Sequence, residues 1–68
     1  DSYVAVLWSE VEGCRLTRPR GARLYDICGR PLEGASTPVG EAPVYVVLAG
    51  RDVQEVTQTL SLSVSIPF

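Results

Sequence analysis

The clearest alternation of apolar and polar residues lies near the end of the chain, over residues 59–66. Its apolar positions are Leu60, Leu62, Val64 and Ile66, and its polar positions are Thr59, Ser61, Ser63 and Ser65. A period of two residues is typical of a β-strand with one buried face and one solvated face. Because Val56 has the same parity as the apolar positions, the pattern predicts a strand that begins near Val53.

Further strands are predicted where β-branched and aromatic residues gather between turn-forming residues. These segments are 3–9, 15–17, 22–27 and 44–48, and residues 36–39 could add a short strand. The apolar spacing expected for a helix is not sustained anywhere in the chain. Short strands separated by turns about every ten residues are typical of an all-β sandwich or barrel. The sequence therefore predicts a single all-β domain, an antiparallel β-sandwich or half-sandwich of about five to six strands.

A turn is predicted at residues 28–31. Gly29 adopts a positive φ at low cost, and Pro31 fixes its own φ and cannot donate a backbone hydrogen bond. Asp26, at the end of the preceding strand, can accept hydrogen bonds from turn amides two residues further on. These roles build the fold and need no ligand.

The strand over residues 3–9 is apolar on both of its faces. One face carries Val4, Val6 and Trp8, and the other carries Tyr3, Ala5 and Leu7. A strand of this kind is usually covered on both sides. Since unpaired strand edges also favour pairing with another chain, we expect a homo-oligomer, formed through edge strands or apolar faces, unless a larger parent protein covers this surface.

The residue types that are missing exclude most catalytic sites. The chain contains no His, Lys, Asn or Met. Catalytic triads and His-ligated zinc need His, and Schiff-base chemistry needs Lys. We therefore expect no enzyme activity, no catalytic residue, no metal and no cofactor. The lack of Met leads us to expect a processed piece, an excised domain or part of a longer reading frame.

Charge and hydropathy narrow the range of partners. The net charge is −2 and the isoelectric point is near 4.8, whereas nucleic-acid binding needs a basic surface. Four of the six arginines lie at positions 15, 18, 20 and 23. They could form an anion patch, but a solvated loop and strand face is favoured. No apolar run approaches the roughly 20 residues of a membrane span, so we expect neither nucleic acid nor membrane as a partner.

Cys14 and Cys28 leave two structures open. A disulfide that closes a loop of about 15 residues can contribute about 3 kcal/mol to stability. The alternative is a pair of free, half-buried thiols, which behave as small apolar side chains.

Glu10 and Glu12 are the most suggestive pair of carboxylates. Two carboxylates are the minimum for glycoside hydrolysis. Because both residues lie in a predicted turn beside Gly13, solvated turn charges are the favoured interpretation.

Three segments occur in an order that resembles a known family. They are residues 4–9, residues 25–32 (YDICGRPL) and residues 39–48 (VGEAPVYVVL). Together they resemble the C-terminal β-sandwich domain of multidomain glycoside hydrolases, in which the sandwich packs against a catalytic (β/α)8 barrel. The resemblance covers residues 3–48. It implies a non-catalytic accessory domain that braces a catalytic domain, because the catalytic carboxylates of such enzymes lie on the barrel.

The alternative function is a self-associating β binding module, for which carbohydrate is one candidate ligand. Sugar-binding modules stack the apolar face of a sugar on exposed aromatic rings. Trp8 and Tyr25 are the candidate residues. Trp8 lies within a strongly apolar strand, which favours core packing, whereas Tyr25 lies between Leu24 and Asp26 and is the better candidate for exposure.

Overall fold

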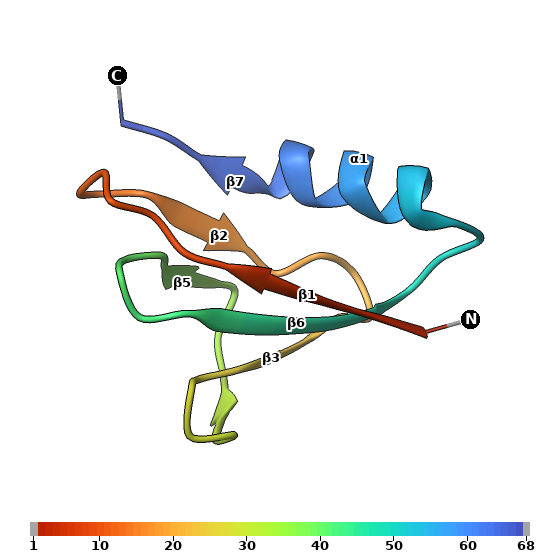
Figure 1. Cartoon of the computed structure of the whole chain (residues 1–68), viewed down its shortest axis with the longest axis horizontal. Helices are drawn as coiled ribbons and strands as arrows, with labels where there is room; N and C mark the ends of the chain where they lie inside the picture. The colour runs from red at the N-terminus through yellow and green to blue at the C-terminus, as the bar shows by residue number, and fades with distance from the viewer. Residues whose placement is uncertain (1, 68) are drawn as a thin grey trace.

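The computed structural model describes residues 2–67 and consists of two antiparallel sheets with one helix (Figure 1). The elements within the described residues are β1 (Ser2–Leu7), β2 (Arg15–Thr17), β3 (Arg23–Tyr25), β4 (Pro31–Leu32), β5 (Ser36–Pro38), β6 (Val44–Ala49), α1 (Val53–Ser63) and β7 (Val64–Ser65). The all-β prediction is confirmed, since most of the elements are strands and the helix is short.

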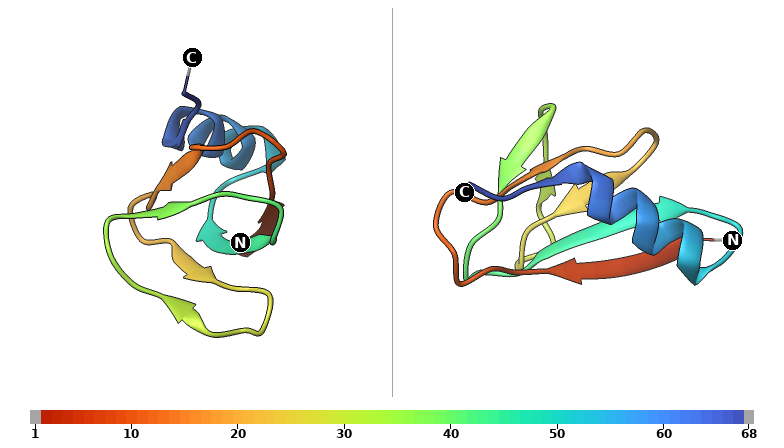
Figure 2. Two further views of the ribbon diagram at one scale, coloured as in Figure 1. Left: turned by 90° about the vertical axis from the view of Figure 1, so that its left-hand side faces the viewer. Right: turned by 90° about the horizontal axis from the view of Figure 1, so that it is seen from above.

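Each sheet combines strands that are distant in sequence. The first sheet has the order β1-β6-β3-β4, and the second has the order β5-β2-β7. In the first sheet, β1 and β6 pair over six residues, from Ser2↔Ala49 to Leu7↔Val44. Figure 2 shows that the strands surround a common interior, and that α1 runs along one side of the molecule.

The core is formed by the inward-facing residues of both sheets and by one face of the helix. Its buried members are Cys14, Leu16, Ala22, Leu24, Val39, Val44, Val46, Leu48, Val56 and Leu60. β6 shows the alternation most clearly, because Val44, Val46 and Leu48 are buried while the residues between them are half-buried. Each such apolar side chain contributes about 1.5–3 kcal/mol when it is fully buried.

The strand predicted from residue 53 to residue 66 is wrong over most of its length, because Val53–Ser63 is α1. Asp52 caps this helix: its carboxylate accepts a hydrogen bond from the backbone N–H of Glu55 at 2.9 Å. Val56 and Leu60, four residues apart, are the buried residues of the helix, whereas Leu62 is exposed. The burial therefore follows the helical period rather than a period of two. Only the last part of the prediction remains a strand, as β7.

The turn predicted between β3 and β4 is confirmed. Asp26 Oδ1 accepts hydrogen bonds from the backbone N–H groups of Cys28 and Arg30, both at 2.9 Å. Gly29 has a φ of 81°, a conformation that other residues rarely adopt. Pro31, which the sequence pattern places in the turn, begins the short strand β4.

Candidate functional site

The outer face of the four-stranded sheet is largely apolar, and it is exposed at β1. On β1, Tyr3, Ala5 and Leu7 pack against the core, while Val4 and Val6 are 66% and 42% exposed. The other face of β1, which the sequence led us to expect under cover, is therefore open to solvent within the described residues.

Neighbouring strands continue this surface across the sheet. Val6 lies opposite Tyr45 of β6, and Tyr45 lies opposite Tyr25 of β3. In the next row, Val4 lies opposite Val47, and Val47 lies opposite Arg23. Residues directly opposite each other have Cβ atoms about 4.5–5.5 Å apart, so each row is a set of contacting side chains. The outer apolar face consists of Val4, Val6, Trp8, Tyr25, Tyr45 and Val47.

The position of Trp8 differs from the one expected from the sequence. It directly follows β1 and is 64% exposed, so the expectation that it packs in the core is wrong. Tyr25 is half-buried, and it shares the outer apolar face with Tyr45. Tyr25 therefore lies on β3 and Trp8 directly follows β1, and these two strands lie on opposite sides of β6.

The side chains of this face are mostly apolar. Its polar side-chain groups are the hydroxyls of Tyr25 and Tyr45 and the indole N–H of Trp8, and the guanidinium of Arg23 lies at its margin. Contiguous exposed apolar patches mark binding surfaces in soluble proteins, and burial of such surface contributes about 25 cal/mol per Å².

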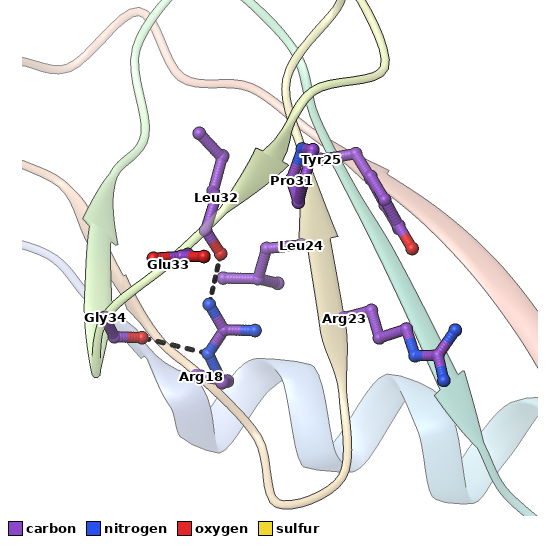
Figure 3. A pocket seen from close by; sticks show the side chains of 8 residues that line it. All are labelled: Arg18, Arg23, Leu24, Tyr25, Pro31, Leu32, Glu33 and Gly34. Atoms are coloured by element: carbon purple, nitrogen blue, oxygen red, sulfur yellow. Dashed lines mark hydrogen bonds between the residues drawn. The ribbon is translucent and has the colours of Figure 1, made fainter.

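A hollow of about 340 Å³ lies over the β3–β4 hairpin, and Arg18 is one of the residues that line it (Figure 3). Arg18 does not face it as a free cation. Its guanidinium donates hydrogen bonds to the carbonyls of Gly34 at 2.9 Å, Ala22 at 3.2 Å and Leu32. These bonds tie three segments of backbone together, so Arg18 has a structural role.

The other arginines of the cluster do not assemble around one anion site. Arg15 donates a hydrogen bond to the hydroxyl of Ser36 at 3.0 Å and is exposed on β2. Arg20 and Arg23 are exposed on the loop before β3 and on β3 itself. These arginines lie on a solvated loop and strand face, which is the interpretation that the sequence favours over an anion patch.

The two cysteines are free thiols, so the structure does not contain the disulfide that the sequence left open. Cys14 is buried in the core, and its Sγ accepts a hydrogen bond from Ser9 Oγ at 3.3 Å. Cys28 lies exposed in the turn between β3 and β4. The two thiols therefore occupy different environments, one in the interior and one at a hairpin tip.

The acidic residues do not gather into a metal site in the part of the chain that the structure describes. Glu10 and Glu12 are both exposed in the loop after β1, as solvated turn charges would be. Among residues 2–67 there is no group of three or more His, Cys, Asp or Glu side chains that could hold a metal ion.

The one ion pair of the described residues lies at the start of α1. Arg51 Nε donates to Glu55 Oε2 at 2.7 Å. This hydrogen bond lowers the pKa of the Glu55 carboxylate and raises the pKa of the Arg51 guanidinium. Both groups are solvated, so the pair organises the helix terminus rather than a reactive site.

The chain matches no family model, and it finds no match among curated proteins or solved structures. Within residues 2–67 there is also no helix with the length and apolar character needed to cross a membrane. The assignment of a function therefore depends on the residues and the geometry described above.

Proposed function

We propose that the chain is a non-catalytic accessory β domain, similar to those of glycoside hydrolases, that docks on a catalytic domain through its outer apolar face. The observation that carries the proposal is the exposure of this face at β1: Val4, Val6 and Trp8 are exposed, and the half-buried Tyr25, Tyr45 and Val47 continue the face across β6 and β3. An accessory domain needs such a surface, because bracing another domain requires a stable apolar contact.

The resemblance to these domains supports the choice of partner. Each of its three segments contributes one residue to a single row across the sheet, namely Val6, Tyr25 and Tyr45. The segments that carry the resemblance therefore also build the proposed docking surface.

The composition of the face favours a protein surface over a sugar. Valine side chains present no hydrogen-bonding group, whereas sugar recognition combines aromatic rings with polar groups that bind hydroxyls. Aromatic residues and arginine are enriched in the cores of protein interfaces. The outer apolar face contains Trp8, and Arg23 lies at the margin of this face.

The test compares the isolated chain with the natural gene product in which it occurs. Hydroxyl-radical footprinting, read by mass spectrometry, reports the exposure of Trp8 in both. We expect a (β/α)8 catalytic domain in the natural polypeptide and a clear loss of Trp8 modification there, with Glu12 of the neighbouring loop as the exposed reference position. Equal modification of Trp8 in both samples, or the absence of a catalytic domain, would contradict the proposal.

A second candidate function is carbohydrate binding, and the exposure of Trp8 favours it. Sugars stack on exposed indole rings, and Trp8 is the only Trp of the chain. Titration of the isolated chain with cello-, xylo- and manno-oligosaccharides would then shift and quench the Trp8 fluorescence. Saturable quenching would support this second function, and unchanged fluorescence would leave docking as the better one.

A further inference from the structure

The four edge strands of the two sheets differ in how they are protected. β4 has two residues and contains Pro31, and β5 has three residues and contains Pro38. β7 has two residues and is closely followed by Pro67. Short edge strands and prolines are the usual means by which proteins prevent further strands from pairing.

β1 has none of these protections. It extends over six residues, Ser2–Leu7, and contains neither proline nor a charged side chain. One side of it pairs with β6, and the other side has no strand partner among the described residues. The backbone N–H and C=O groups on that side form a ready template for another strand.

An apolar groove lies beside the C-terminal end of β1. It has a volume of about 420 Å³ and is lined by Leu7, Thr57, Leu60, Ser61, Val64 and Ile66. These residues come from β1, α1 and the segment that begins with β7, and the views in Figures 1 and 2 show α1 running alongside β1. We call this the β1–α1 groove.

The groove restricts the chemistry of an occupant. None of its lining residues is charged, and the hydroxyls of Thr57 and Ser61 are its only polar side-chain groups. Ser61 Oγ already donates to the carbonyl of Thr57 at 2.9 Å. A charged side chain finds no charged partner among these residues, so the groove favours an uncharged, apolar side chain.

We infer that the β1 edge and the β1–α1 groove together bind an extended, uncharged β-strand from another polypeptide. Its backbone pairs with the free edge of β1, and its alternate apolar side chains enter the groove. In peptide recognition by strand addition, main-chain hydrogen bonds give affinity and side-chain pockets give specificity. The inference does not rest on the proposed function, because the outer apolar face lies on the other side of the sheet.

The experiment uses the whole 68-residue chain and a fluorescein-labelled, terminally blocked peptide of alternating Thr and Val. Fluorescence anisotropy measures binding, and amide hydrogen exchange by NMR locates it. We expect saturable binding and slower exchange of β1 amides. A peptide of the same composition with Pro at its centre, which cannot pair along its length, should bind much more weakly.

Two lysine substitutions on α1 separate the groove from general charge effects. Ser61→Lys places an ammonium in the groove and should weaken peptide binding by at least about tenfold. Gln58→Lys makes the same change of charge at an exposed helix position outside the lining and should leave binding unchanged. Circular dichroism of both variants should match the parent chain, since lysine is a good helix former.

Three results would overturn the inference. The first is no protection of β1 amides at millimolar peptide, and the second is equal binding by the Ser61→Lys and Gln58→Lys variants. The third is sedimentation equilibrium showing a dimer that Ser61→Lys dissociates, which would assign the groove to a second copy of this chain. A failed Trp8 footprint would contradict only the proposed docking of the outer apolar face, so the two proposals fail separately.

Discussion

Leu24 and Leu62 are the same type of residue in opposite surroundings. Leu24 lies on β3 and is 2% exposed, whereas Leu62 lies on α1 and is 82% exposed. We expect Leu24→Ala to lower the free energy of unfolding by about 2–5 kcal/mol, because the substitution removes buried methyl groups and leaves a cavity. Leu62→Ala should change it by less than about 0.5 kcal/mol.

Urea denaturation of the two variants measures the difference. An equal loss of stability for both would mean that Leu62 is covered in solution, and that α1 does not lie as described. A small loss for Leu24→Ala would mean that the interior is loosely packed.

Trp8 provides a second prediction for a single residue. Because it is 64% exposed, Trp8→Ala should leave a folded chain, with a change in unfolding free energy far below the roughly 3–5 kcal/mol typical for a buried Trp. Thermal unfolding followed by circular dichroism provides the measurement. In the parent chain, acrylamide should quench the indole fluorescence efficiently, and a shielded, blue-shifted emission would contradict the exposed position.

The helix α1 depends on its first turn. Asp52 accepts the hydrogen bond from the Glu55 N–H, which would otherwise have no partner within the helix. Asp52→Ala should destabilise the chain by about 0.5–2 kcal/mol. Gln54→Ala, at an exposed position of the same turn, is the matched control and should have little effect. Similar losses for the two variants in urea denaturation would show that the cap contributes nothing.

The Arg51–Glu55 pair makes this helix terminus sensitive to pH. The hydrogen bond from Arg51 lowers the pKa of Glu55 in the folded chain. The stabilisation is therefore fully present above the pKa of an ordinary glutamate and is lost as the pH falls through the lowered, folded-state value. Because both side chains are solvated, the effect should be small.

Glu55→Gln isolates this contribution. The difference in urea midpoint between the parent chain and the variant should be constant near pH 7 and should shrink in the acidic range. A difference that grows as the pH falls would contradict the lowered pKa.

The strands were predictable to different degrees from the pattern of residues. Runs such as 44–48 have the β-branched residues and flanking turns that define a strand locally. The apolar pattern does not identify the helix, because Val56 and Leu60 have the same parity and are also four residues apart, so they fit both the strand period and the helix period. The spacing of Asp52 and Glu55 is the local signal that favours the helix over the strand. It places a capping residue three positions before an acidic residue.

At the scale of the whole molecule, the candidate surface was only partly predictable. The sequence places Val4, Val6 and Trp8 on one side of a strand, because that follows from a period of two. It does not reveal that Tyr45 and Tyr25 join them, because strand order and register depend on pairing between distant segments. The local sequence also does not determine whether this side of the strand is buried, because another molecule can cover it.

The pairing of β1 with β6 also determines how the chain reaches its native state. β3 and β4 are joined by a short turn, but the register Leu7↔Val44 and its neighbours join segments separated by most of the chain. Closing so long a loop costs entropy before any contact compensates for it, and folds dominated by distant pairings form in milliseconds to seconds. We therefore expect β1 to join the sheet late in folding, so that the first segment in the sequence is among the last to acquire its structure.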